Sequence, residues 1–466
     1  MSLKCLFLVS LLIYAGCNKT TQKTETSDVK TQIKEPQKKV DSIKTRNVML
    51  INNVQIFNGK DEKISEGNIL VVDNIISRIS AEPISISEYP TAKTIDGKGK
   101  FLMPGLIDNH MHLIMCASTK QELMAPDASI DTIESKAKIE AKQLLLRGFT
   151  SIRDVGGPVF NIKKAIDKGE TEGPRIYPSG GMISQTSGHG DFRTPEEKSR
   201  RFGGKISAGE LLGFGFIADG RDEVLTATRE NLRAGATQIK LMAGGGAASD
   251  YDPLDVAQYT FDELKAAVEA ADDWGTYVTV HAYTPKAVKR AMDAGVKCIE
   301  HGQLLDEETI KLLADKGIWL SLQALDEAPP TQTKLVREKK HQVVQGTENA
   351  FIWAKKYKVK LAFGTDYMFN PPGNKNQNLD YLKLKEWLSP FEILKMATYD
   401  NAQLLALCGL RNPYQAGELG ILEEGAYADM ILVDGNPLED IDLMGDPGKN
   451  FLMIIKDGII FKNMMR

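Results

Sequence analysis

The sequence predicts a (β/α)8 TIM barrel with a small β-sandwich that is assembled from both ends of the chain. Between residues 104 and 409, short apolar stretches alternate eight times with segments of helical spacing, which is typical of a parallel barrel. Residues 48–103 and 410–466 instead carry short β-rich runs separated by turn residues. A doubly wound nucleotide-binding sheet is the alternative, but no glycine-rich phosphate fingerprint follows the first strand.

The N-terminal residues have the composition of an export signal. Residues 1–17, "MSLKCLFLVSLLIYAGC", place Lys4 before an apolar stretch and end on small residues, which indicates a secretory signal peptide. The ending "YAGC" is similar to a bacterial lipobox, so Cys17 is the expected lipidation site; a simple cleaved signal is the alternative. Residues 18–47 are polar and form a flexible linker. We therefore expect a membrane-anchored bacterial lipoprotein of the cell envelope, on the periplasmic or outer-surface face.

The two β-rich regions on either side of the predicted barrel have the same pattern of strand-forming runs and turn residues. The first contains "VMLINNVQIF" and "GNILVVDNIISRIS", and the second contains "GILEEGAYADMILVDGNP" and "FLMIIKDGIIFKN". Alternating β-branched residues bounded by Asn, Asp and Gly predict strands joined by tight turns. Residues 48–103 and 410–466 are thus expected to form one composite sandwich.

The central region contains eight strand candidates separated by helical segments such as "DELKAAVEAADDWG", many of which end at glycine. The glycine-rich stretch at 243–248, "AGGGAA", lacks the P-loop ending and the dinucleotide spacing, so it is interpreted as backbone room beside a site. The eight candidate strands are "LIDNHMHL", "TSIRDVG", "RIYPSGGMI", "QIKLMA", "YVTVHAY", "KCIEHG", "IWLSLQ" and "KLAFGTD".

Composition gives no indication of a nucleic-acid partner or of a disulfide framework. The formal net charge is -4 and the pI is near 6.0, and no basic stripe interleaves with aromatic residues, so no nucleic-acid partner is expected. Cys116, Cys298 and Cys408 are widely scattered, so we expect no disulfide framework although the compartment would permit one.

Metal-binding residue types recur at the ends of the strand candidates. The C-terminal ends of barrel strands converge on one mouth, so residues far apart in sequence meet there. His110 and His112 are two residues apart on one strand, so both side chains point to the same side. Imidazole and carboxylate are good ligands for Zn²⁺. The candidate metal ligands are His110, His112, Lys240, His281, His301 and Asp366.

Lys240 is the unusual member of this set, because an ammonium group is repelled by a metal ion. Burial and nearby metal would lower its pKa, and a neutral amine can take up carbon dioxide to give a carbamate, an anion able to bridge two metals. The alternative for Lys240 alone is a strand-end lysine that extends to solvent.

This set of residues resembles the amidohydrolase superfamily. The matching motifs are "HMH", "IKLMAGGG", "VTVHAY", "IEHG" and "FGTD", and the resemblance covers nearly the whole chain after residue 47. The segments "SGHGDFR", "DGRDEVLTATRENLRAGATQIKLMAGGG" and "HAYTPKAVKRAMDAGVKCIEHG" are most similar to the prolidase-like and imidazolonepropionase-related hydrolases.

The resemblance implies a binuclear hydrolase of C–N amide bonds. His110, His112 and Asp366 would hold one divalent ion and His281 and His301 the other, with Zn²⁺ the expected ion. N6-carboxylated Lys240 and a hydroxide would bridge the two ions. The hydroxide would attack the substrate carbonyl, and Asp366 would shuttle its proton to the leaving amine.

Substrate contacts are assigned to three residues outside the ligand set. His189 lies in a loop flanked by glycines and is expected to bind substrate or to donate a hydrogen bond to the developing oxyanion. Arg153 and Arg193 are candidates for clamping a substrate carboxylate, against the alternative of ordinary ion pairs. His341 lies in a polar helical context and is interpreted as a surface residue.

The expected partner is a small peptide or amide, with a dipeptide or N-acyl amino acid as the leading candidate. The loop "SLQALDEAPPTQT" departs from relatives, so no amino-acid preference transfers. Two alternatives stay open: a mononuclear cyclic amidase or deaminase of the same superfamily, and a non-catalytic substrate-binding lipoprotein. The sequence also leaves open whether the chain forms a homo-oligomer.

Overall fold

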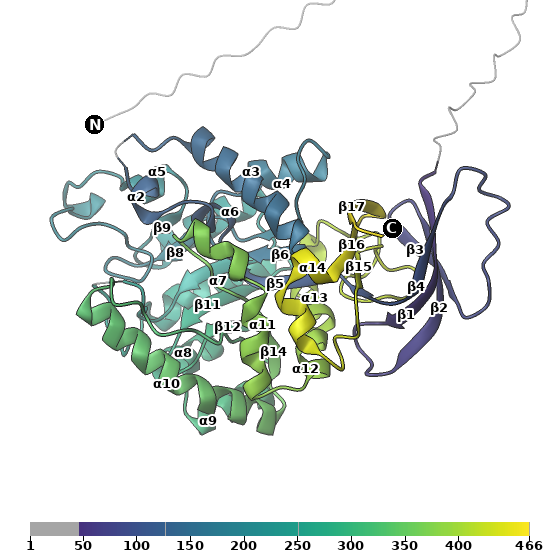
Figure 1. Ribbon diagram of the computed structural model, residues 1–466. Coiled ribbons are helices and arrows are strands. Elements are labelled where there is room, and N and C mark those ends of the chain that lie inside the picture. The colour runs from purple at the N-terminus through teal and green to yellow at the C-terminus, as the bar shows by residue number, and fades with distance from the viewer. Residues whose placement is uncertain (1–45, 126, 250, 466) are drawn as a thin grey trace, which may run out of the picture. The chain divides into compact units, whose positions relative to one another are not determined.

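The computed structural model describes residues 46–125, 127–249 and 251–465 (Figure 1). The predicted signal peptide, the lipidation site Cys17 and the predicted linker up to residue 45 lie outside this range. Within the described part of the chain, every helix is too short or too polar to cross a bilayer.

Both ends of the described chain contribute to one seven-stranded sheet (Figure 1). Its central strand β4 pairs in parallel with β1 and antiparallel with β15, so β4 joins the N-terminal strands to the C-terminal ones. The order is β17-β16-β15-β4-β1-β2-β3, with β1 (Val48–Phe57), β2 (Ile64–Val72), β3 (Ile75–Ser80), β4 (Lys93–Pro104), β15 (Met430–Val433), β16 (Phe451–Lys456) and β17 (Ile459–Asn463).

The composite sheet packs on the barrel through strands from both ends of the chain. Ile431 of β15 and Phe451 of β16 belong to the same buried apolar cluster as the barrel interior. A buried ion pair adds to this contact, because Arg175 from the barrel lies 3.2 Å from a carboxylate oxygen of Asp429. The two regions therefore share one core, and the sheet supports the barrel from the side.

Eight short strands form the barrel, and every hydrogen-bonded neighbour in it is parallel. The ring closes because the Asn109 N–H donates to the Phe363 carbonyl at 2.9 Å and the Thr237 N–H donates to the Pro178 carbonyl at 2.8 Å. The predicted fold class is confirmed. The strands are β5 (Leu106–Met111), β6 (Phe149–Asp154), β7 (Arg175–Pro178), β10 (Ile239–Met242), β11 (Val278–Ala282), β12 (Cys298–His301), β13 (Trp319–Ser321) and β14 (Lys360–Ala362).

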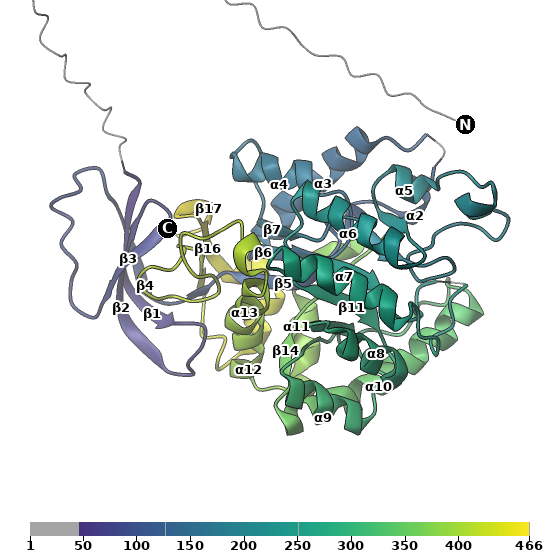
Figure 2. The same cartoon turned by 180° about the vertical axis from the view of Figure 1, so that it is seen from behind.

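Helices follow the strands and cover the outside of the barrel (Figure 2). Three of them end as their sequences predict, because Gly235, Gly295 and Gly317 adopt positive φ values of 107°, 106° and 64° after the last turn. The longer helices are α3 (Ile130–Leu146), α4 (Phe160–Asp167), α6 (Arg221–Ala234), α7 (Phe261–Asp273), α8 (Pro285–Ala294), α9 (Glu307–Lys316) and α10 (Lys334–Tyr357). The shorter ones are α1 (Leu113–Cys116), α2 (Lys120–Leu123), α5 (Ala208–Leu211), α11 (Leu379–Lys383), α12 (Pro390–Lys395), α13 (Asn401–Ala406) and α14 (Pro447–Asn450).

The third strand candidate is divided in two. Gly180 has a φ of 74°, which turns the chain between β7 and a second short strand, β8 (Met182–Ser184). Asn231 stabilises this break, since its side chain accepts from the Gly181 N–H at 3.0 Å and donates to the Gly181 carbonyl at 2.7 Å. Strand β8 pairs with β9 (Gly215–Ile217), so the loop between them starts at the barrel mouth.

The cysteines of the barrel region are free thiols. Cys116, Cys298 and Cys408 are all buried and unpaired in the described structure. Burial raises the pKa of Cys298 to about 12, so this thiol is protonated and unreactive at neutral pH.

Candidate metal centre

The six predicted metal ligands line one cavity of about 1020 Å³. They lie within or after five barrel strands, on the side of the strands' C-terminal ends, where barrel sites form. His110 and Lys240 lie within β5 and β10, His281 and His301 within β11 and β12, and His112 and Asp366 after β5 and β14.

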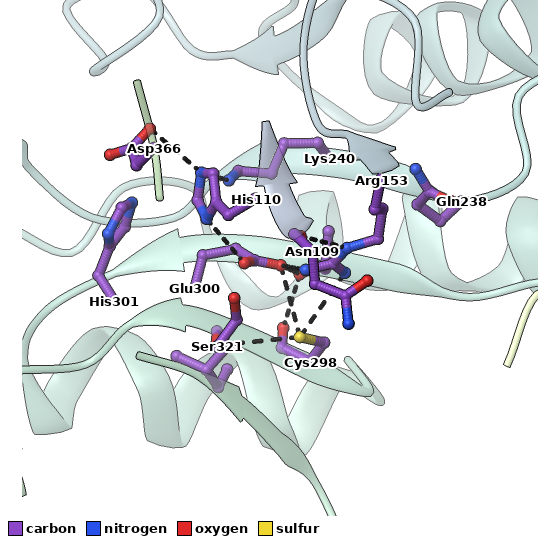
Figure 3. A network of polar contacts seen from close by, with 12 residues as sticks. Asn109, His110, Arg153, Gln238, Lys240, Cys298, Glu300, His301, Ser321 and Asp366 are labelled. Atoms are coloured by element: carbon purple, nitrogen blue, oxygen red, sulfur yellow. Dashed lines mark hydrogen bonds and ion pairs between the residues drawn. The ribbon is translucent and has the colours of Figure 1, made fainter. Parts of the chain in front are cut away.

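His110 is the centre of the cluster (Figure 3). Its Nε2 lies 3.4 Å from Asp366 Oδ1 and 3.5 Å from the Lys240 amine. His112 Nε2 lies 3.5 Å from the same Asp366 oxygen. The His301 ring lies 4.9 Å from the His110 ring between centroids.

His281 is the last of the six predicted ligands, and its ring lies next to the ring of His301. The two ring centroids are 4.5 Å apart. The prediction that six distant residues meet therefore agrees with the observed placement, although the ligand roles themselves stay predictions.

Outer partners fix which nitrogen of each histidine faces the cluster. The His112 Nδ1–H donates to the Gly156 carbonyl at 3.1 Å, and the His281 Nε2–H donates to the Gly245 carbonyl at 3.0 Å. Carbonyl oxygens only accept hydrogen bonds, so the other nitrogen of each ring carries the lone pair. Outer partners of this kind orient metal-binding histidines.

The remaining two histidines follow the same rule. His301 Nδ1 lies 2.8 Å from the Gln323 amide oxygen, and His110 Nδ1 lies 2.9 Å from a Glu300 carboxylate oxygen. A proton on each Nδ1 leaves each Nε2 unprotonated and facing the cluster. All four histidines therefore present a lone pair to the same small volume.

Glu300 connects His110 to a fully buried arginine (Figure 3). One Glu300 oxygen accepts from Arg153 Nη2 at 2.6 Å and from the Thr279 hydroxyl. Arg153 Nε donates to the Asn109 carbonyl at 2.7 Å. Although burial raises the pKa of the Glu300 carboxyl, Arg153 and His110 hold it well below its usual range, so Glu300 is ionised.

This network corrects the role expected for Arg153. The residue is 0% exposed and does not line the cavity, and its guanidinium is bonded to Glu300, Tyr277 and the backbone. The predicted contact with a substrate carboxylate is wrong. Because its partners are the Asn109 carbonyl, Tyr277 and Glu300, the side chain points into the barrel interior rather than toward the mouth.

The observed donors fit divalent cations. Asp366 Oδ1 is buried and accepts no hydrogen bond from the described residues, although it lies among imidazoles. One ligand atom each from His110, His301 and Asp366 lies within 4.8 Å of the others. His301 and Asp366 have positive φ values of 78° and 56°, a conformation that non-glycine residues adopt where the surrounding structure imposes it.

Burial disfavours the charged forms of His110, His281, His301 and Lys240. It lowers the pKa of His110 to about 4, with a further contribution from Lys240, and lowers the pKa of His281 and His301 well below the usual value. Burial likewise lowers the pKa of the Lys240 amine. Neutral imidazole and amine are the forms that bind a metal or react with carbon dioxide.

His189 lies beside the cluster, on the loop between β8 and β9. Its ring stacks on His281 with centroids 4.1 Å apart, and Nδ1 lies 3.0 Å from both Asp252 Oδ2 and Ser249 Oγ. A Cβ atom at Gly246 would come within 1.8 Å of the His189 ring, so the prediction of backbone room at 243–248 is confirmed. Although burial opposes it, the hydrogen bond from His189 holds the pKa of Asp252 below its usual range.

Arg193 was predicted to contact substrate, and His341 was predicted to lie on the surface. Arg193 lines the cavity, but its guanidinium makes two hydrogen bonds to Asp191, at 2.8 and 2.6 Å. The positive charge of Arg193 is therefore already balanced by Asp191 of the same loop. His341 is exposed and pairs with Glu327 at 2.8 Å, as expected for a surface residue.

Sequence reasoning missed three residues around the cluster. Glu300 and Gln323 orient His110 and His301, and the buried Tyr283 stacks on the His301 ring at 5.1 Å. Glu300 did carry a signal, because a carboxylate inside the apolar strand "KCIEHG" requires a buried partner.

Comparison with known proteins decides the family. Residues 101–460 match the amidohydrolase family. The chain belongs to the amidohydrolase family. Ochratoxinase of Aspergillus niger is 33% identical over 422 residues, covering 87% of this chain and 84% of that protein. Its crystal structure superposes with a TM-score of 0.75 at 29% identity, covering 90% of this chain and 96% of that one.

Two further structures are similar to this amidohydrolase over 90% of its chain. One is a prolidase complexed with N-methylphosphonate-L-proline, with a TM-score of 0.81, 31% identity and 100% of that chain covered. The other is a Xaa-Pro dipeptidase with bound methionine in the active site, with a TM-score of 0.76, 29% identity and 100% of that chain covered. The resemblance seen in the sequence is confirmed. The protein is a hydrolase of carbon–nitrogen bonds from a metal-dependent family, and its structure contains a group of residues able to hold a metal ion.

Proposed function

We propose that this amidohydrolase is a binuclear metal-dependent enzyme that cleaves the C–N bond of dipeptides or N-acyl amino acids. The observation that carries the proposal is the convergence of four histidines, one lysine and one aspartate on a single cavity. Relatives support the substrate class, since the similar structures include a prolidase and a Xaa-Pro dipeptidase. The prolidase ligand, N-methylphosphonate-L-proline, joins a tetrahedral phosphorus to an amino acid with a free carboxylate.

Lys240 is proposed to hold both metal ions as a carbamate. It is 1% exposed, burial lowers its pKa, and it makes no ion pair with any described carboxylate. A buried ammonium without a paired anion is costly, so the neutral amine is favoured. Attack of that amine on carbon dioxide forms the new N–C bond and releases one proton, giving an anion between His110 and the other histidines.

The assignment of ligands to two ions is the one that the resemblance to amidohydrolases implies. His110, His112 and Asp366 would hold one ion, and His281 and His301 the other, with Lys240 between them. When bound, the ions would supply a polarised substrate carbonyl and a water whose pKa falls from about 15.7 to about 7.

The chain's own residues would manage protons and developing charge. Asp366, which projects into the cavity, would accept the proton of the attacking water and deliver it to the leaving nitrogen. His189, whose Nδ1 lies 3.0 Å from Asp252 Oδ2, would donate a hydrogen bond from its ring to the developing oxyanion. The buried Tyr283 packs His301 in place.

The experiment is a screen of dipeptides and N-acyl amino acids against the zinc-loaded protein, with the metal-depleted protein as control. Release of free amino acid only by the metal-loaded protein supports the proposal. Deamination of purine nucleosides without any amide cleavage would favour the deaminase alternative, and absence of turnover would favour a binding protein.

We also propose that the enzyme is tethered to the cell envelope through Cys17. The proposal rests on the residues "LIYAGC", which lie outside the described structure. Metabolic labelling with a radioactive fatty acid in a bacterial host tests it. The wild-type chain should be labelled and Cys17→Ala should not. Equal labelling of the two proteins would exclude Cys17 as the lipidation site.

A further inference from the structure

The cavity needs a cation for a substrate carboxylate, and the two predicted arginines do not supply it. Arg153 is buried away from the cavity, and Arg193 is paired with Asp191. Lys383 also lines the cavity, but its amine binds Asp326 at 2.6 Å and Asp380 at 2.8 Å. These three charges are therefore already matched within the protein, and Lys120, which also lines the cavity, is exposed to solvent.

Lys340 on α10 is different. Thr333, Val336 and Lys340 all line the cavity, and their spacing of three and four residues places them on one face of the helix. Lys340 is half-buried and has no hydrogen bond or ion pair with any residue that the structure describes. Asp326 and Asp380, the nearby carboxylates, are bonded to Lys383 instead.

The neighbouring residue anchors the helix at the site. The Lys339 amine donates to three backbone carbonyls, those of Gly246 at 2.9 Å, Ser249 at 2.7 Å and Asp252 at 2.7 Å. This is the loop that holds His189 beside the metal cluster. The segment of α10 that carries Lys340 is therefore held in place relative to His189 and the metal-binding residues.

The electrostatic environment of Lys340 links it to the same site. Burial lowers the pKa of its amine, and the negative charges of Asp366, Asp326 and Asp380 oppose this effect. Because Asp326 and Asp380 are bonded to Lys383, the partly dehydrated Lys340 amine faces the cavity without an anion bonded to it. An anionic group on the substrate would restore the balance.

We propose that Lys340 binds the free α-carboxylate of the substrate's C-terminal residue while the scissile carbonyl lies at the metal-binding residues. The inference rests on the proposed function and narrows it: the enzyme would act on N-acyl amino acids and dipeptides and would discriminate against amides, esters and internal peptide bonds. Lys340 is thus a specificity residue rather than a catalytic one.

The test compares two probes that differ only in charge, N-acetyl-L-phenylalanine and N-acetyl-L-phenylalaninamide. The wild-type enzyme should prefer the carboxylate, and Lys340→Met should lower kcat/KM for it by about 10- to 100-fold, mainly through KM, because one charged hydrogen bond is lost. Turnover of the amide should be unchanged in this variant, and Lys340→Arg should retain part of the preference. Lys334→Met is the matched control, since Lys334 lies on the same helix with its side chain 83% exposed.

A binding measurement separates this inference from the proposed function. Calorimetry with L-phenylalanine and L-phenylalaninamide should show tighter binding of the acid to the wild-type protein, and Lys340→Met should remove the difference. That result supports the carboxylate site even if no amide is hydrolysed, in which case only the proposed function fails. Equal affinities for the two probes, or an unchanged preference in Lys340→Met, would overturn the inference even if hydrolysis is observed.

Discussion

Replacing Arg153 by methionine tests whether this residue supports the site or contacts the substrate. The guanidinium is fully buried and is bonded to Glu300 at 2.6 Å, and Glu300 in turn lies 2.9 Å from His110. Arg153→Met leaves the Glu300 carboxylate buried with its main counter-charge removed. We expect the protein to lose stability, and His110 to lose its fixed orientation.

The magnitude follows from the burial of both partners. Removing one member of a buried pair costs about 3–5 kcal/mol in the free energy of unfolding. An unfolding entropy of about 2.1 cal/mol/K per residue over about 420 residues gives about 0.9 kcal/mol/K, so Tm should fall by about 3–6 °C. The double variant Arg153→Met with Glu300→Met removes both charges, so it should be more stable than Arg153→Met alone.

Differential scanning calorimetry of the metal-loaded protein measures these shifts. Arg233→Met is the control, because Arg233 is 75% exposed in its pair with Glu230 and should change Tm by little. A normal Tm for Arg153→Met, combined with a raised KM only for substrates with a free carboxylate, would show that the residue contacts substrate and that the reasoning from burial is incorrect.

Four further predictions concern the metal centre and the residues beside it. Elemental analysis should find two divalent ions per chain, and chelation should abolish hydrolysis until Zn²⁺ is restored; one ion per chain in the active protein would favour the mononuclear alternative. Lys240→Ala should abolish turnover, with partial rescue by acetate or propionate but not by ethylamine, and unchanged turnover would refute the bridging role. His189→Ala should lower kcat by about 10²–10³, as for loss of one oxyanion donor. Asp252→Asn should lower kcat less because the imidazole remains, and equal effects of the two changes would mean that Asp252 acts mainly by folding the loop.

The alternation of the sequence predicts the barrel because eight apolar strands are separated by helices with recognisable ends. It does not predict the break in the third strand. The stretch "RIYPSGGMI" is apolar on both sides of Gly180 and Gly181, so its pattern does not distinguish one strand from two. The hydrogen bonds from Asn231, fifty residues later, stabilise the turn, and a contact at that separation has no local signature.

The metal ligands are predictable for a different reason. The C-terminal ends of parallel strands meet whatever their separation in sequence, so His110 and Asp366 could be brought together without coordinates. The direction of Arg153 could not be assigned in this way, because every residue of β6 is buried and alternation no longer separates interior from mouth. Lys340 was missed because it lies on a helix rather than at a strand end, where only the packing of α10 decides which face meets the cavity.

The same packing determines the charge state of the cluster. The carbonyls of Gly156 and Gly245 accept hydrogen bonds from the outer nitrogens of His112 and His281, and a Glu300 oxygen lies 2.9 Å from the outer nitrogen of His110. Burial meanwhile disfavours a second proton on His110 and His281. A divalent ion that enters the cavity would therefore meet inner ring nitrogens whose lone pairs are free and already point toward it. Because Glu300 is itself held by a buried arginine, it cannot move to the cavity and compete as a ligand, so its charge acts only by making His110 a stronger donor.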